Sequence, residues 1–372
     1  MGKVSVMCKY NAFDEKYAFD DEGLFTYSST EQKRVEQLAR EQFQNFIDSF
    51  MDNIEDDIDY LPVLDKTLHI KHLVQSLEQL SSSFSQLEAS RAWFCYWGVH
   101  SLGLLEAPLS EDLASSIVRF LKTCGPGQYP HLATTYGAVM ALISIGTDEA
   151  LASINTTTLK NFLLSVKQPD GSFALHIGGE IDIRGSYCAL AVASITNILD
   201  SELTENADIW IIRCQTYEGG FGGERFCEAH GGYTFCGVAS LIILGKSALI
   251  HRSSLIKWLA FKQMKYEGGF QGRTNKLVDS CYSFWQAAVF PILEVAELIL
   301  GNSVFSSFDG KALQEYVLIA CQDMNNGGLK DKPDRLSDLY HSCYALSGLS
   351  VAQYYTADGV IGGEVNRLVW CY

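Results

Sequence analysis

The chain has 372 residues, of which 47% are hydrophobic and 19% are charged, and its formal net charge is -16. This composition is that of a folded protein with a large core, since disordered chains carry fewer apolar residues. The negative charge argues against a general affinity for nucleic acids or anionic membranes, because the summed field of the chain repels both.

Signals for targeting or domain division are weak. No apolar run is long enough to span a membrane, and residues 1–10 lack the apolar core of a secretory signal. We therefore expect a cytoplasmic protein without stable membrane insertion. Seven prolines and the lack of a Ser/Gly-rich linker favour one large domain or one repeat array. The eleven cysteines lie scattered in apolar segments and are interpreted as reduced.

The first predicted element is an N-terminal helical extension within residues 1–80. Its helical part covers residues 32–78, where Leu38, Phe43 and Phe46 recur at loose helical spacing. A different kind of helix, apolar on most of its surface, is predicted from Ser90 through Leu105.

A turn signature then repeats along the chain, which is the most informative feature of the sequence. Each copy runs from a glutamine to a phenylalanine or leucine, usually across a pair of glycines, and it follows a helix with one apolar face. The copies are Gln168–Phe173, Gln215–Phe221, Gln263–Phe270 and Gln322–Leu329.

A second type of helix, rich in small residues and apolar on all sides, is also repeated, after each turn and once before the first. Such helices must be buried and closely approached by their neighbours. They begin near Tyr136, Tyr187, Tyr233, Tyr282 and Tyr344. Alternating outer and inner helices without a β-rich window predict an all-α fold, an α/α toroid (α-α barrel) over residues 81–350, followed by a divergent tail at 351–372.

One position of the repeat lies three residues before the first tyrosine of an inner helix. In four successive inner helices this position holds a polar residue. The four residues are Arg184, His230, Asp279 and His341. A packing position would repeat an apolar or small residue, so this variety indicates a shared cavity mouth. The alternative is that these are helix N-caps, which suits aspartate but suits arginine and histidine poorly.

Three residues in this register could bind a metal. Asp279, Cys281 and His341 offer a carboxylate, a thiolate and an imidazole on neighbouring inner helices. Three protein ligands with one open position are typical of a catalytic zinc site rather than a closed structural one. The bare pattern is weak, and it gains weight only from the repeat register.

Cations and aromatic residues surround these ligands in the sequence. Arg273 and Lys276 precede Asp279, and His230 lies one repeat earlier, which predicts a pocket for a compact anion such as diphosphate. Each of the two cations alone could instead lie in a solvated loop. Aromatic walls are predicted from Trp93, Trp97, Tyr136, Tyr187, Tyr233, Trp285 and Tyr340, although any one of these could simply be core. An apolar funnel that ends in cations fits a long hydrocarbon diphosphate.

From about residue 32 to about residue 352 the chain resembles the β subunits of protein prenyltransferases, most closely those of the farnesyltransferases. The segments that carry the resemblance are Gly127–Leu132, Glu228–Cys236, Glu267–Arg273, Asn275–Asp279, Cys281–Trp285, Tyr340–His341 and Cys343–Tyr344.

The resemblance implies an enzyme that transfers a 15-carbon farnesyl group from farnesyl diphosphate to the cysteine of a C-terminal CaaX motif, and that is active only as a heterodimer with an α subunit. It implies that Asp279, Cys281 and His341 hold one Zn²⁺, and that Asp331 binds Mg²⁺ with the diphosphate. The catalytic set would be these three zinc ligands with Tyr282 and Lys276.

The resemblance also assigns the substrate contacts. The diphosphate would meet His230, Arg273, Lys276 and Tyr282. Isoprenoid contacts would come from Arg184, Tyr187, Tyr233, Cys236 and Trp285, and the acceptor protein would also meet Trp93, Trp97 and Tyr340.

Two alternatives stay open. Geranylgeranyl relatives typically have a lysine in place of Asp331, and a floor of Trp93, Tyr136 and Tyr187 is bulky, so the farnesyl group is favoured over a type I geranylgeranyltransferase. The second alternative is a non-catalytic truncated isoform that binds the α subunit. It is suggested by a short first repeat, without the expected turn at residues 123–128, and by the divergent tail, which together predict a toroid incomplete at its C-terminus.

Overall fold

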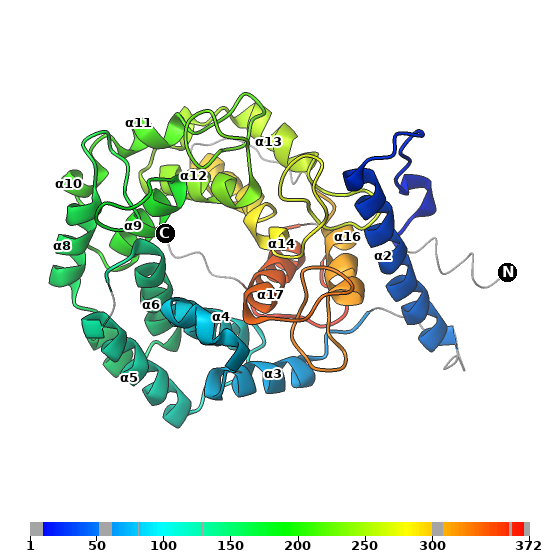
Figure 1. The fold of residues 1–372 in the computed structure, drawn as a ribbon, viewed down its shortest axis with the longest axis horizontal. Helices are drawn as coiled ribbons and strands as arrows, with labels where there is room; N and C mark the ends of the chain where they lie inside the picture. Colours follow the sequence, from blue (N-terminus) through cyan, green and yellow to red (C-terminus); the bar gives the residue numbers. More distant parts are fainter. Residues whose placement is uncertain are drawn as a thin grey trace.

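The helices alternate between two concentric rings in the computed structural model, which describes residues 10–51, 62–80, 82–127, 129–299, 308–356 and 359–367 (Figure 1). Each inner helix packs against the next, and the last packs against the first, so the inner ring is closed. The inner helices are α4 (Arg91–Leu104), α6 (Leu132–Ile145), α9 (Ile183–Ile195), α12 (Gly231–Ile243), α14 (Tyr282–Trp285) and α17 (Leu339–Tyr354).

An outer helix precedes each inner helix. The outer helices are α3 (Lys66–Glu78), α5 (Glu111–Gly127), α8 (Thr156–Val166), α11 (Ala207–Ile212), α13 (Arg252–Ala260) and α16 (Gly310–Glu315). In α8, Leu159, Leu163 and Val166 form the buried face, whereas α12 is buried along almost its whole length. This difference is the one that the two sequence patterns predict, and it confirms the all-α toroid.

The remaining helices are short connections, apart from α2 and α15. They are η1 (Glu15–Tyr17), α2 (Tyr27–Met51), η2 (Ser82–Ser90), α7 (Asp148–Ala152), α10 (Ser201–Thr204), η3 (Ser247–Leu249), α15 (Val289–Ile299) and the π-helical η4 (Tyr316–Ala320). In the described parts of the chain no helix is both long enough and apolar enough to cross a membrane.

The repeated turns are closed by one antiparallel bridge each. The bridges join Gln215 to Phe221, Gln263 to Phe270 and Gln322 to Leu329, and Lys167 to Phe173 in the first copy. The side chain of Gln215 donates to the carbonyl of Gly219 (2.8 Å), and Gly219 has a φ of +111° that side-chain-bearing residues avoid. A glutamine and a glycine are therefore required at fixed places in the turn.

The N-terminal prediction of one helical extension corresponds to two helices with different positions. Helix α3 packs against α4 as the first outer helix, while α2 lies outside the ring beside α16 (Figure 1). The first inner helix, predicted from Ser90 through Leu105, is observed as Arg91–Leu104.

The predicted incompleteness at the C-terminus is not found. Helix α17 continues to Tyr354 and packs against α4, so the described inner ring closes without a further helix. The tail then returns along the ring, with Ile361 and Val365 buried. Two buried glutamines bind its backbone: Gln314 donates to Gly359 O (2.8 Å) and Gln353 donates to Gly363 O (3.0 Å). The sequence divergence therefore leaves the closure of the ring intact.

Candidate active site

The three predicted metal ligands converge at the starts of α14 and α17. One ligand atom from each of Asp279, Cys281 and His341 lies within 4.8 Å of the other two. His341 Nε2 is 3.3 Å from Asp279 Oδ1, and Cys281 is only 3% exposed. This donor set of one sulfur, one nitrogen and one oxygen fits a zinc ion with an open position.

The segment with Asp279 and Cys281 is fixed by the neighbouring turn. Ser280 between them is fully buried; its N–H donates to Asp331 O (2.8 Å) and its hydroxyl donates to Lys330 O (2.7 Å). Cys281 N–H in turn donates to Asp279 Oδ1 (3.0 Å). We call residues 279–281 the ligand arm. Its geometry depends on the Lys330–Asp331 turn.

Sequence reasoning missed Asp338. This residue caps α17, with Oδ1 accepting from His341 N–H (2.8 Å), and its Oδ2 lies 2.7 Å from His341 Nδ1. A carboxylate on one imidazole nitrogen directs the other nitrogen to the metal. The signal was an aspartate three residues before a histidine at a helix start, which is also a capping pattern.

The electrostatics of the triad suit a cation. Burial raises the pKa of the Cys281 thiol well above its ordinary value, and the charge of Asp279 adds to this. Burial alone would lower the pKa of His341, but its hydrogen bonds to Asp279 and Asp338 raise it to about 9. Burial likewise opposes ionisation of Asp279, yet the hydrogen bond from His341 lowers its pKa overall. Positive charge is thus stabilised here, and a divalent metal ion supplies it while favouring the thiolate.

A cavity of about 400 Å³ opens beside the triad and is walled by aromatic side chains. All the predicted wall residues line it: Trp93, Trp97, Tyr136, Tyr187, Tyr233, Cys236, Trp285 and Tyr340. Ala133, Cys188 and Tyr344 also line it and were not predicted in this role. Of the four positions that the repeat register selected, Arg184 and His230 line this cavity, whereas Asp279 and His341 are not among its lining residues.

Contacts among the wall residues satisfy several of their polar groups. Trp93 stacks on Trp97 with ring centroids 5.5 Å apart. The hydroxyls of Tyr136 and Tyr187 are 3.2 Å apart, and Trp285 Nε1 donates to Tyr340 OH (3.0 Å). Because these hydroxyls and the indole N–H are paired with one another, the walls present mainly apolar surface to the cavity.

His230 stands at the polar edge of the cavity and has two roles. Its Nδ1 accepts from Gly232 N–H (3.1 Å), so it caps α12, and its Nε2 lies 3.0 Å from Tyr282 OH. The expectation that histidine is a poor cap is wrong here. Burial, with Arg273 nearby, lowers the pKa of His230 and keeps the imidazole neutral, which allows Nδ1 to accept. For Arg184 and His341 the caps are Asp182 and Asp338 instead.

The predicted cations lie at different distances from the cavity. Arg184 lines it, is ion-paired with Asp182 (2.5 Å) and lies over the Tyr233 ring. Arg273 and Lys276 are not among the residues that line it. Arg273 pairs with Glu228 (2.9 Å), and Lys276 is exposed. The structure therefore does not bring the two cations that precede Asp279 onto the cavity wall.

Asp331 lies directly behind the ligand arm. Its carboxylate is ion-paired with the nearly buried Lys332 (2.6 Å), a partner that sequence reasoning missed. Its Oδ1 is buried and has no hydrogen-bond partner among the described residues. An unsatisfied carboxylate oxygen is compatible with binding Mg²⁺.

Known proteins share sequence and fold with this chain. The prenyltransferase alpha-alpha toroid domain matches residues 64–368. Protein farnesyltransferase subunit beta of Arabidopsis thaliana is 39% identical over 360 residues, covering 79% of this chain and 74% of that protein. The Pisum sativum subunit is 42% identical over 330 residues, covering 71% and 78%. A solved Candida albicans protein geranylgeranyltransferase-I complexed with GGPP, 23% identical, superposes with a TM-score of 0.66 over 78% of this chain and 91% of that chain.

The chain therefore belongs to the prenyltransferase family that is built on the alpha-alpha toroid domain. Within this family its relatives are β subunits of protein prenyltransferases. The geranylgeranyl transferase type-1 subunit beta of Arabidopsis thaliana is 33% identical over 333 residues, covering 78% of this chain and 85% of that protein, and thus shares fewer identical residues than the farnesyl type. The similarity to the Candida structure supports the fold alone.

Proposed function

We propose that this chain is the β subunit of a cytoplasmic, zinc-dependent protein farnesyltransferase. It would act with an α subunit and transfer the 15-carbon group of farnesyl diphosphate to the cysteine of a C-terminal CaaX motif. The observation that carries this proposal is the convergence of Asp279, Cys281 and His341, whose chain neighbours Tyr282 and Tyr340 line an aromatic cavity.

The residues of the chain divide the reaction between binding and charge compensation. Asp279, Cys281 and His341 would hold one Zn²⁺, which stabilises an acceptor thiolate at neutral pH when bound. The aromatic walls bind the hydrocarbon and exclude water from it. Tyr282 OH and His230 lie together where the diphosphate would leave, and Tyr282 can donate a hydrogen bond to the developing charge.

Further charge compensation would come from the rim. Arg273 and Lys276 would meet the diphosphate from outside the cavity, and Arg273 would have to exchange its ion pair with Glu228. Asp331 would bind Mg²⁺ in place of its ion pair with Lys332. The first exchange leaves the exposed Glu228 without its ion pair, which costs little, whereas the second separates the nearly buried Lys332 from Asp331 and therefore carries a cost.

The choice of the 15-carbon group rests on the cavity. Tyr136 contacts both Trp93 and Tyr187 on the wall, and the hydrogen bond between the two tyrosine hydroxyls joins α6 to α9. Three large side chains at this place shorten the space for a hydrocarbon. A 20-carbon chain would need them to move.

The test is co-expression with an α subunit, followed by measurement of zinc content and of transfer to a CaaX peptide from both isoprenoid diphosphates. We expect one zinc per heterodimer and a preference for farnesyl diphosphate. Preference for the 20-carbon diphosphate would identify a type I geranylgeranyltransferase. Binding of the α subunit without zinc or transfer would instead identify a non-catalytic chain.

A further inference from the structure

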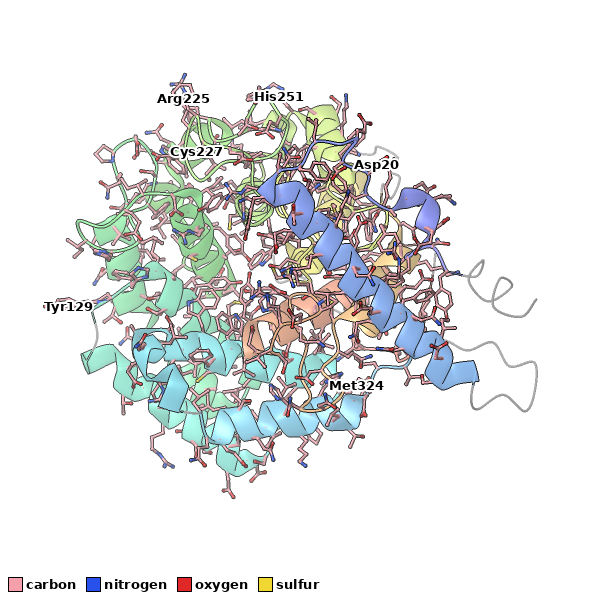
Figure 2. All side chains as sticks on the ribbon, turned by 45° about the vertical axis from the view of Figure 1, so that its right-hand side comes forward. Asp20, Tyr129, Arg225, Cys227, His251 and Met324 are labelled. Atoms are coloured by element: carbon pink, nitrogen blue, oxygen red, sulfur yellow. The ribbon has the colours of Figure 1, made fainter. Side chains whose placement is uncertain are left out.

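The N-terminal segment of residues 10–51, which we call the strap, lies outside both rings. Figure 2 shows helix α2 of the strap crossing the front of the molecule, with Asp20 near the N-terminal end of that helix. One face of α2 is buried at Val35, Ala39, Phe43 and Ile47. Phe13 stacks on Phe43 with ring centroids 4.9 Å apart, and its N–H donates to Tyr266 O (2.6 Å). The strap is thus folded onto the barrel.

The first polar anchor of the strap is Glu315 at the end of α16. This residue is 1% exposed, and its Oε2 accepts from the N–H groups of both Asn11 (2.9 Å) and Ala12 (2.8 Å). Its nearest cation, Lys311, is 3.9 Å away and Asp309 adds negative charge. Burial raises the pKa of Glu315 to about 7. The carboxyl is therefore only partly ionised at neutral pH, and in either state an oxygen can accept from the two backbone groups.

The second anchor is Glu267 in the turn that follows α13. It is fully buried, and its Oε1 accepts from Gln32 Nε2 (2.9 Å). The same amide nitrogen donates to Glu36 Oε1 (2.9 Å), while Glu36 Oε2 accepts from Phe19 N–H (2.8 Å). A single glutamine therefore links two carboxyl groups, one on the strap and one on the barrel.

Both anchors adjoin the supports of the ligand arm. Tyr316, next to Glu315, is fully buried and donates its hydroxyl to Asp331 O (3.0 Å), the same carbonyl that accepts from Ser280 N–H. A Cβ added at Gly269, two residues after Glu267, would lie 2.5 Å from the Tyr316 ring. The Tyr316 ring is thus packed tightly between the second anchor and the arm.

We propose that the strap positions the metal centre: by fixing Glu315 and Glu267 it holds Tyr316, and through Asp331 O it holds the ligand arm. Glu315 and Gln32 are then positioning residues. This inference rests on the proposed function for its metal, and it adds a role for a segment that contributes no ligand. Release of the strap frees the Tyr316 ring, and the arm loses one of its fixed points.

The experiment compares Glu315→Ala with Glu315→Gln in the full chain with its α subunit. Alanine leaves two buried N–H groups unpaired, whereas glutamine keeps an acceptor oxygen for both and places its NH2 at the buried Oε1 position, which has no hydrogen-bond partner among the described residues. Glu41→Ala, on the exposed face of α2, is the matched control. Three quantities are measured: hydrogen exchange at Asn11 and Ala12, hydrogen exchange at Ser280, and the rate of zinc loss to a chelator.

We expect Glu315→Ala to speed exchange at the strap and at Ser280 and to speed zinc loss about tenfold, the lower end of effects from residues behind metal ligands. Glu41→Ala should match the wild type, and Glu315→Gln should lie much closer to the wild type than Glu315→Ala does. The inference fails if Ser280 and zinc loss stay unchanged while the strap exchanges faster, or if glutamine behaves like alanine.

Two further outcomes are separated by design. If Glu315→Ala does not fold, Gln32→Ala takes its place, because it removes only the second anchor. The same three quantities are measured for this variant. If the wild-type chain holds no zinc, the proposed function is refuted, but the coupling of strap and arm is not. Hydrogen exchange at Ser280 reports on that coupling whether or not a metal is bound.

Discussion

The starts of α12 and α17 occupy equivalent places in the repeat, and each carries a histidine three residues before a tyrosine. At α12 the histidine itself is the cap, and burial lowers the pKa of His230. At α17 the cap is Asp338, and the carboxylates of Asp279 and Asp338 outweigh burial and raise the pKa of His341 to about 9. The pKa values of the equivalent histidines thus shift in opposite directions, because Asp279 and the capping Asp338 both contact His341 whereas burial dominates at His230.

This difference separates two chemical tasks on one scaffold. A capping histidine uses Nδ1 for the backbone and offers a neutral Nε2, which His230 directs to Tyr282. A histidine behind a capping aspartate has Nδ1 bound by a carboxylate, which leaves Nε2 of His341 beside Asp279. The first arrangement suits binding of a polar substrate group, and the second suits metal ligation.

The largest effect is expected at Cys281, which lies at the start of α14 and converges with His341 of α17. Cys281→Ala removes one of three protein ligands, so zinc binding should weaken by more than the ~100-fold typical of residues behind the ligands, and transfer should be lost with it. Zinc content after dialysis and single-turnover transfer are the measurements. Cys214→Ala, another buried cysteine, should keep both. A fully active, zinc-free Cys281→Ala would end the metal assignment.

The next effect concerns the cap of α17. Asp338→Asn keeps a good capping residue but replaces the carboxylate on His341, so zinc affinity should fall ~10–100-fold with little change in thermal midpoint. Asp338→Ala should lose the same affinity and also about 1 kcal/mol of stability. Chelator competition and thermal unfolding separate the two losses. Equal zinc affinity in Asp338→Asn and wild type would show that the carboxylate does not orient the ligand.

A smaller effect is expected at the α12 side. His230→Asn preserves the cap but removes the partner of Tyr282 OH, so kcat/KM for the isoprenoid diphosphate should fall about tenfold while zinc content stays at one per chain. In Tyr282→Phe, kcat/KM should fall at least as far. In the double variant, the loss of transition-state stabilisation should be smaller than the sum of the two single losses. Additive losses would mean that the two residues act independently.

The sequence was sufficient for the ring and for the convergence of Asp279, Cys281 and His341 because both follow the repeat. Helix type, the turns and the positions of Asp279, Cys281 and His341 all lie in one register. What lies outside the register was not predicted: Asp338 lies three residues from a ligand, and Lys332 is in a loop. The return of the tail along the ring was missed since Gln314 and Gln353 bind the tail through its backbone, which leaves no sequence pattern.

The smallest effect tests the capping histidines through pH. His131 caps α6 as His230 caps α12, with Nδ1 accepting from Ala133 N–H (3.2 Å), and burial lowers its pKa. A depressed folded-state pKa means that the stability from this cap is present above the unfolded value near 6.5 and is lost as pH falls through the folded value. His131→Asn keeps a cap that does not titrate in this range. Between pH 7 and pH 5 the variant should therefore lose about 1 kcal/mol less stability than the wild type in urea unfolding, while zinc content and transfer at pH 7 stay unchanged. Parallel losses in the two proteins would show that protonation of His131 does not break its cap.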